Sequence, residues 1–267
     1  MALPLLARAT AAAAASAYLS ARLSLPDDLL FYKISGSTLL NMLRAHRAGR
    51  TNLYYLLEER ALSPATASDP FLIFEGRTHT YAETYARVLR WGEYLRSRHG
   101  VQPGEVVALD FMNSDNFVFL WFALWSLGAT PAFVNYYLTG RPLVHTLQTS
   151  KARLVLVDPQ VAGNLTEQVR ADAGEGVTFL QVDDRVEKEV EATEPKRQAD
   201  EGRKVESHVG MAILIYTSGT TGMPKPAVMS WLKIYAASMM AAKGTGLGKG
   251  DVFYLVSLTV DFCGSGR

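Results

Sequence analysis

Cysteine is nearly missing from this sequence, which has Cys263 as its one cysteine in 267 residues. A single cysteine can form neither an internal disulfide nor a cluster of thiolate metal ligands, so disulfide scaffolds and zinc–cysteine sites are excluded. An excess of charge is missing too, because the formal net charge is +1. Nucleic-acid binding calls for a concentrated basic face, so we expect no nucleic-acid partner. The 48% of hydrophobic residues is typical of a globular protein.

Acidic residues are absent before Asp27, and Arg8 and Arg22 are the charged residues that precede it. The uncharged stretch 9–21 has 13 residues, whereas about 20 apolar residues span a bilayer. The surrounding segment could cross one only if both arginines reached the membrane interface. We therefore predict that residues 1–50 form a membrane-associating segment. A cleaved targeting peptide and a plain alanine-rich helix are the alternatives.

A second apolar stretch, Phe117 to Val134, has 18 residues and no charge. A transmembrane helix is one interpretation of such a run. The preceding "NSDN" offers helix-capping side chains, however, and Gly128 followed by Pro131 offers a stop. We therefore predict a buried helix, a turn and a buried strand "TPAFV".

The segment 71–80, "FLIFEGRTHT", is typical of a hairpin that turns at Glu75 and Gly76. Thr80 and Glu83 then have the spacing of a capping box, which predicts a helix that Gly100 ends. Further short apolar strands alternate with helical segments. They are expected at 104–111, 153–158, 177–182 and 210–216. This alternation predicts an α/β domain with a largely parallel sheet.

Residues 183–206 contain nine acidic and six basic side chains. We interpret this stretch as a solvated surface connection with the composition of a partly disordered segment, and assign it no chemistry.

The stretch "ILIYTSGTTGMPKPAVM", residues 213–229, interrupts an apolar strand with hydrogen-bond donors. Gly219 and Gly222 allow the backbone to approach a ligand closely, and the N–H groups of such a loop can converge on an anion. Lys225 adds a positive charge after Pro224. Hydroxyl donors come from Thr217, Ser218, Thr220 and Thr221. Because no acid is present, the implied ligand is a polyphosphate.

Two other kinds of loop share features of this stretch. A loop rich in serine, threonine and glycine is often only a turn. A Walker-type phosphate loop would need glycine and a hydroxyl residue where this sequence has Pro224 and Pro226, so it is not a Walker loop.

The ten residues Tyr216 to Lys225, "YTSGTTGMPK", resemble the AMP-binding signature of the adenylate-forming acyl-CoA synthetases. Upstream segments such as "FEGRTHTYAE" and "NSDNFVFLWFALWSLGATPAFVNYYLTGRPLVHTL" extend the resemblance over roughly 25–254. Together with the apolar N-terminus they are similar to the very-long-chain acyl-CoA synthetase and fatty-acid transport protein branch. The resemblance implies an incomplete N-terminal domain at 51–267, with mixed, mostly parallel sheets flanked by helices.

This resemblance also implies a reaction and a site. A fatty-acid carboxylate attacks the α-phosphorus of Mg·ATP, and the thiol of CoA then displaces AMP from the acyl adenylate. ATP, Mg²⁺ and CoA are therefore the expected co-substrates and cofactors, and a long- or very-long-chain fatty acid is the expected partner. Lys225 would be the catalytic residue that offsets charge on the leaving pyrophosphate, and no metal ligand is assigned. The triphosphate would be bound by Tyr216, Thr217, Ser218, Gly219, Thr220, Thr221 and Gly222.

Similar proteins continue for several hundred residues and read from "GKGDVFY" into a Pro-Leu-Tyr-His segment. This sequence instead ends in "LVSLTVDFCGSGR". We therefore expect a truncated product or gene model without the C-terminal domain, and we expect the chain by itself to be inactive.

Two other functions compete with the ligase. One is a non-catalytic membrane protein that binds or transports fatty acids with the same fold. The other is an enzyme that adenylates aryl or amino acids, which the apolar N-terminus disfavours. A membrane location is expected at the endoplasmic reticulum, peroxisome, lipid droplet or plasma membrane.

Overall fold

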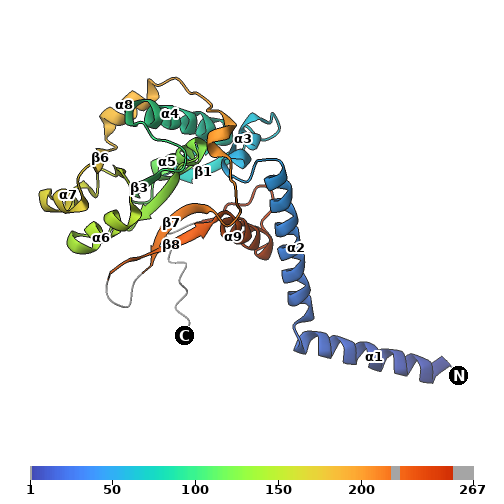
Figure 1. Ribbon diagram of the computed structural model, residues 1–267. Coiled ribbons are helices and arrows are strands. Elements are labelled where there is room, and N and C mark those ends of the chain that lie inside the picture. The colour runs from blue at the N-terminus through green and yellow to red at the C-terminus, as the bar shows by residue number, and fades with distance from the viewer. Residues whose placement is uncertain (1, 218–222, 255–267) are drawn as a thin grey trace. The chain divides into compact units, whose positions relative to one another are not determined.

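The computed structural model describes residues 2–217 and 223–254. The chain divides into two compact units (Figure 1). Among the described residues, the helical unit consists of 2–45 and 235–251, and the sheet unit consists of 46–217, 223–234 and 252–254.

The helical unit contains α1 (Ala2–Arg22), α2 (Leu25–Arg47, most of it) and most of α9 (Trp231–Gly244). Ser24 separates α1 from α2 and has a left-handed backbone with φ of 51°. Lys243 of α9 donates a hydrogen bond from Nζ to Ser37 Oγ of α2 at 3.0 Å. Across residues 2–217 and 223–254, none of the helices combines the length and apolar character that crossing a membrane needs.

The sheet unit starts with α3 (Tyr54–Leu62) and a two-stranded hairpin of β1 (Pro70–Phe74) and β2 (Arg77–Thr80). Glu75 and Gly76 form its turn with positive φ values of 46° and 78°, which confirms the predicted position. Thr80 and Glu83 make the predicted capping box at the start of α4 (Tyr81–His99), and Gly100 ends that helix in a left-handed conformation.

The main sheet has six strands in the order β6-β5-β3-β4-β7-β8. All neighbours are parallel except β7 and β8. The strands are β3 (Val106–Asp110), β4 (Thr130–Val134), β5 (Leu154–Val157), β6 (Thr178–Gln181), β7 (Met211–Thr217) and β8 (Lys225–Ser230). Four predicted strands are thereby confirmed, and so is the mixed α/β fold with a mostly parallel sheet.

The apolar stretch 117–134 is a buried helix and strand, as predicted. Helix α5 (Asp115–Leu127) begins where Ser114 Oγ accepts a hydrogen bond from the Phe117 amide at 3.1 Å, and it ends at Gly128 with φ of 76°. β4 follows and is buried along its whole length. The aromatic side chains of α5 pack on the sheet, because the ring centroids of Phe117 and Phe133 lie 4.8 Å apart.

Helices cover both faces of the sheet (Figure 1). α4 and α5 lie on one face, and α6 (Gly140–Ser150) packs on the other, where α7 (Glu167–Ala173) follows the short 3₁₀ turn η1 (Ala162–Asn164). The α6 face buries a continuous apolar cluster. Its strand and helix members include Ala108, Ala132, Val134, Leu143, Leu147, Val155, Val157, Val169 and Leu214. Alternate residues of each strand point to this cluster, as the pleat of a strand requires.

The charged stretch 183–206 is more than the solvated connection that we predicted. It forms α8 (Asp184–Glu191) and the 3₁₀ turn η2 (Asp200–Arg203). The Arg203 side chain is fully buried, with its guanidinium carbon 4.5 Å from the centre of the Tyr54 ring. Its polar partners lie within the same stretch, at the carbonyl oxygens of Gln198 and Ala199, and the aromatic contact comes from α3. Composition misleads here, because a charged side chain can be buried where the fold supplies it with partners.

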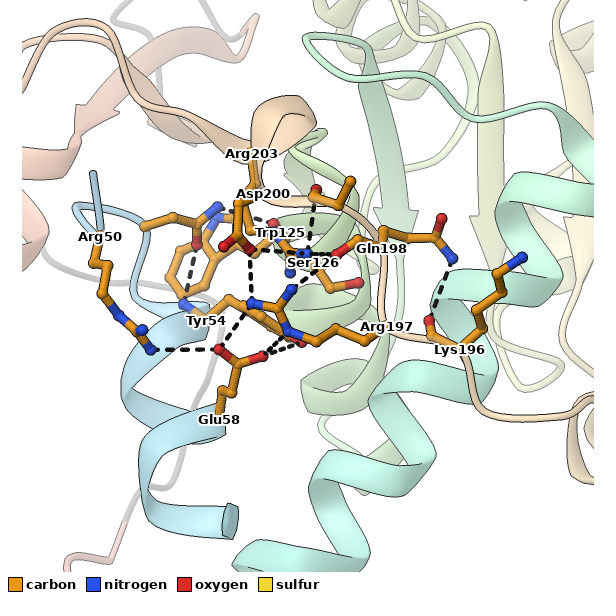
Figure 2. Close-up of polar contacts among 12 residues, drawn as sticks. Arg50, Tyr54, Glu58, Trp125, Ser126, Lys196, Arg197, Gln198, Asp200 and Arg203 are labelled. Atoms are coloured by element: carbon orange, nitrogen blue, oxygen red, sulfur yellow. Dashed lines mark hydrogen bonds and ion pairs between the residues drawn. The ribbon is translucent and has the colours of Figure 1, made fainter. Parts of the chain in front are cut away.

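A second charged residue of this stretch, Arg197, reaches Glu58 on α3 (Figure 2). Glu58 is 3% exposed and accepts hydrogen bonds from Arg197 at 2.6 and 3.2 Å. Tyr85 donates to Glu58 at 3.0 Å and Tyr54 at 3.1 Å, and Arg50 pairs with it at 3.4 Å. We call these five residues the Glu58 cluster. It ties the segment that leads into β7 to the first helix of the sheet unit.

Candidate functional site

The glycine–threonine loop lies between two antiparallel strands. Tyr216 and Thr217 are the last residues of β7, and Lys225 is the first residue of β8. Thr217 pairs with Lys225 in the strand register, and its hydroxyl donates to the Lys225 carbonyl oxygen at 3.5 Å. The predicted binding residues Ser218, Gly219, Thr220, Thr221 and Gly222 lie outside the described residues. The structure therefore brings the two ends of the predicted site together at the mouth of a hairpin.

Lys225 is the charged residue at this mouth. Its side chain is exposed, while the preceding Pro224 is buried. Within residues 2–217 and 223–254, no ion pair joins Lys225 to a carboxylate. An exposed lysine without such a partner can offer its full charge to an anion beside the loop.

Tyr216 faces the interior rather than the hairpin mouth. Its hydroxyl donates to the Thr146 carbonyl oxygen of α6 at 3.0 Å, and its ring packs on the apolar cluster under that helix. Burial raises the pKa of Tyr216 above its usual value, so the phenol stays neutral. Among the predicted site residues, Tyr216 thus anchors the end of β7, and its hydroxyl is already used within the fold.

The end of β7 belongs to the carboxyl edge of a parallel sheet. In open α/β sheets, ligands bind in the crevice outside this edge, where neighbouring strands send their connections to opposite faces. β3 continues into α5 on one face, and its neighbour β4 continues into α6 on the other. The candidate loop starts one strand further along, on β7. Its position therefore agrees with the usual place of a ligand site in this fold class.

Two buried carboxyls at this edge were missed by the sequence reasoning. Asp110 ends β3 and is 1% exposed, and Asp158 directly follows β5 and is 4% exposed. Burial, followed by the charge of Asp158, raises the pKa of Asp110 to about 7. The available signal was an aspartate that directly follows an apolar run, in "VVALD" and again in "LVLVD".

The described part of the chain contains no group of three or more histidine, cysteine or acidic side chains that could hold a metal ion. Asp110 and Asp158 are two such groups and do not reach that number. The hairpin mouth brings Thr217 and the exposed Lys225 together, and a phosphate-binding role for it stays a prediction.

Comparison with known proteins identifies the relatives of this chain. A family model described as AMP-binding enzyme matches residues 58–265. A very long-chain fatty acid transport protein of Saccharomyces cerevisiae is 38% identical over 169 residues, which are 60% of this chain and 25% of that protein. A protein of the same name from Cochliobolus heterostrophus is 33% identical over 238 residues, which are 85% of this chain and 35% of that protein.

A solved structure supports the same fold. The o-succinylbenzoate CoA synthetase of Bacillus subtilis, in complex with its acyl-adenylate intermediate, is 25% identical with a TM-score of 0.59. The match covers 73% of this chain and 47% of that one. The chain thus spans about a quarter to a third of the length of the two curated relatives and about half of the matched structure.

Proposed function

This chain belongs to the AMP-binding enzyme family, and we propose that it provides the phosphate-binding part of an enzyme that converts long- or very-long-chain fatty acids to acyl-CoA through an acyl adenylate. The observation that carries the proposal is the hairpin mouth, where Thr217 and the exposed Lys225 are paired on either side of the signature loop. The names of the two curated relatives support a fatty acid as the substrate.

The proposed reaction has two steps. In the first, a carboxylate oxygen of the fatty acid bonds to the α-phosphorus of ATP, and the bond from that phosphorus to the bridging oxygen breaks as pyrophosphate leaves. In the second, CoA sulfur bonds to the acyl carbon, the carbon–oxygen bond to AMP breaks, and the thiol proton passes to solvent. Neither step needs a nucleophile from the protein, so positioning and charge stabilisation account for catalysis.

Each described residue of the hairpin has a role in this proposal. The Lys225 ammonium offsets the negative charge that grows on the leaving pyrophosphate. Thr217 adds a hydroxyl at the start of the loop, and Tyr216 fixes the end of β7 through its bond to α6. The loop residues Ser218 to Gly222 would supply the remaining donors. Mg²⁺ enters as part of the Mg·ATP substrate, and CoA is the second co-substrate.

A lysine variant tests the role of the hairpin. In a version of the protein that has the full length of its relatives, Lys225→Ala should lower the rate of pyrophosphate release roughly 10²- to 10³-fold, which is typical for the loss of one charge-stabilising donor. Its thermal stability should stay close to that of the parent, because changes at exposed positions usually shift stability by no more than about 0.5 kcal/mol. Lys188→Ala is the matched control, since Lys188 is an exposed lysine on α8. Equal rates for Lys225→Ala and Lys188→Ala would refute the role.

The 267-residue chain alone should bind ATP weakly and form no acyl-CoA. Solvent-exposed charge contacts contribute about 1 kcal/mol or less each, whereas micromolar binding requires about 8 kcal/mol. The adenine, the ribose and the metal need further contacts, which we assign to the remaining length of the relatives. Calorimetric titration with Mg·ATP and a thioester assay check this expectation. Micromolar binding or measurable turnover would contradict it.

A non-catalytic fatty-acid transport or binding protein is the second candidate, because both curated relatives are named transport proteins. Incubation of the longer version with oleate, ATP and CoA separates the two candidates. Thioester formation supports the ligase, and fatty-acid binding without thioester supports the transport protein.

The proposal also assigns residues 1–50 to membrane association and residues 51–267 to the AMP-binding domain. The support is the run of exposed apolar side chains on α1, on α2 and in the turn between them. These are Tyr18, Leu19, Leu23, Leu25, Leu29, Leu30, Phe31, Tyr32, Leu39, Leu40 and Leu43. Residues 1–50 fused to a soluble reporter should sediment with the membranes of fractionated cells, and a wholly soluble reporter would contradict the assignment. Which membrane is bound can be read from the same fractions.

A further inference from the structure

Asp110 and Asp158 lie side by side at the carboxyl edge of the sheet, but they differ in their hydrogen bonds. Asp158 accepts bonds from two backbone amides, from Gln160 at 2.9 Å and from Met112 at 3.3 Å. Both carboxyl oxygens of Asp110 are buried, and neither has a hydrogen-bond partner within residues 2–217 and 223–254. The Asp158 carboxyl therefore has two amide donors, whereas no described donor compensates a charge on Asp110.

The surroundings of Asp110 are apolar. Strand alternation places Asp110 on the same face as Ala108, towards the cluster under α6. Its neighbours in register are Val134 on β4 and Val157 on β5, both buried. The ionisable residues of α6 are Arg141 and His145, and neither is among the groups that shift Asp110. A negative charge on Asp110 would be destabilised by burial and also by repulsion from Asp158.

The two acids also belong to one hydrogen-bonded unit. The Asp158 amide donates to the Asp110 carbonyl oxygen at 2.9 Å, and the Asp158 carboxylate holds the Met112 amide. The Asp158 carboxylate thus holds one amide in each segment that leaves the sheet here, Met112 in 111–114 towards α5 and Gln160 in 158–161 towards η1, and a charge on the adjacent Asp110 side chain would push that carboxylate away from both amides. Both segments form part of the carboxyl edge.

We propose that Asp110 is a proton-operated latch: protonated, it keeps the segments 111–114 and 158–161 closed against the sheet, and loss of its proton loosens them. Repulsion between two adjacent buried carboxylates supplies the force. Burial and the charge of Asp158 raise the pKa of Asp110 to about 7, so the proton is exchanged near neutral pH. The latch requires no ligand. The proposal is therefore independent of what the neighbouring hairpin binds.

The latch lies close to the candidate site in the strand order. Asp110 is in register with Val134, and Ala132 is in register with Leu214. Continuing the second register by two residues places Val134 beside Tyr216. Asp110 is therefore two strands away from the end of β7, about 10 Å at the usual strand spacing. A change at the latch occurs on the edge from which the signature loop leaves.

Carbon-13 NMR of aspartate carboxyls in the 267-residue chain tests the protonation directly. We expect one carboxyl resonance whose titration midpoint lies at about 7. This resonance should be absent from Asp110→Asn. It should remain in the control Asp184→Asn, which changes an exposed aspartate of α8. Asp158→Asn should lower that midpoint, because the repelling charge is gone. A parent protein in which every aspartate titrates near its ordinary value would overturn the proposal.

Amide hydrogen exchange tests the opening. Exchange rates are first corrected for their intrinsic pH dependence. In the parent and in Asp184→Asn, the protection of the amides in 111–114 and 158–161 should then fall several-fold from slightly acidic to slightly alkaline pH. In Asp110→Asn this protection should stay constant. The same pH dependence in all three proteins would overturn the latch. If Asp110→Asn fails to fold, the NMR titration midpoints of the parent and of Asp158→Asn are compared instead. Equal midpoints in these two proteins would also overturn the proposal.

Discussion

Glu58 and Asp110 are two carboxyls buried in the same sheet unit, with 3% and 1% of their surfaces exposed. Their pKa values nevertheless move in opposite directions. Burial alone would raise the pKa of Glu58, but hydrogen bonds from Arg197 and Tyr85 outweigh burial and hold it below the usual range. Asp110 has no such donor, and burial together with Asp158 raises its pKa to about 7. The comparison shows that partners, rather than depth, decide whether a buried acid keeps its charge.

The two acids also differ in how they affect folding. Glu58 joins α3 to a segment 139 residues further along the chain through Arg197, so its charge helps to hold the fold together. A charged Asp110 would strain the fold instead. Four substitutions separate these effects, and all are measured as the free energy of unfolding of the 267-residue chain in urea.

The largest effect is expected for Glu58→Gln. The substitution leaves Arg197 without its main counter-charge and weakens the hydrogen bonds from Tyr54 and Tyr85. We expect the free energy of unfolding to fall by about 3 kcal/mol at neutral pH. This value is at the lower end of the range for breaking a buried ion pair, because Arg197 is partly exposed. Glu194→Gln is the control, since Glu194 is exposed in the same charged stretch, and it should change stability little. Similar effects of the two variants would mean that the Glu58 cluster contributes no more than a surface charge.

The pH dependence of that loss has a defined sign. Because the pKa of Glu58 is lowered in the folded state, its stabilisation is present above its unfolded pKa of about 4.3 and is lost as the pH falls through the folded value. The difference between parent and Glu58→Gln should therefore shrink in acid. A difference that grows in acid would contradict the assigned pKa direction.

Asp110→Asn should act in the opposite direction and stabilise the chain by about 2 kcal/mol at pH 8. The folded pKa of about 7 exceeds the unfolded value of Asp110, and this difference corresponds to a destabilisation of the charged form by ~4 kcal/mol. The gain from Asp110→Asn is smaller, because burying the asparagine amide also costs free energy. Because the folded pKa is raised, the parent should lose stability as the pH rises from about 4 to about 7, and the variant should not. A variant less stable than the parent at pH 8 would show that Asp110 has a partner after all.

Tyr85→Phe should cost about 1.5 kcal/mol, because it removes one hydrogen bond to a charged acceptor without opening a large cavity. It should also raise the pKa of Glu58 towards its usual value, since the Tyr85 bond lowers it. Tyr32→Phe is the matched control, because the Tyr32 side chain is 71% exposed. Equal unfolding free energies for both variants would assign the stability of the cluster to Arg197 alone.

Arg50→Ala should have the smallest effect, within about 0.5 kcal/mol. The Arg50 side chain is 46% exposed and its closest approach to Glu58 is 3.4 Å, so solvent and salt screen the pair. Added salt should remove most of the difference from the parent. A loss as large as that of Tyr85→Phe would mean that Arg50 is needed to keep Glu58 charged.

Local signals account for the elements that could be predicted from the sequence. The hairpin turn at Glu75 and Gly76, the capping box of Thr80 and Glu83, and the stop at Gly128 each depend on residues within a few positions of one another. The candidate site follows the same rule, because Tyr216, Thr217 and Lys225 are close together in the chain. Their pairing across a hairpin follows from the strand, loop and strand around them.

The stretch 183–206 shows where local reasoning ends. Its charge density is that of a solvated connection, yet Arg203 is buried against Tyr54 and Arg197 pairs with Glu58. Both partners lie more than 100 residues earlier in the sequence. No periodicity or motif connects segments so far apart.

The sequence by itself determined most of the strands and helices, the mostly parallel α/β class and the place of the AMP-binding signature, because propensity, capping and turn chemistry act between near neighbours. Only the tertiary structure decided in which direction the pKa of each buried acid moves. Glu58 and Asp110 both occur next to apolar residues in the sequence, and what separates them is whether the fold brings donors or a second carboxylate to them. Electrostatic energy depends on distance in space and on exclusion of water, and both quantities are set when distant segments pack together.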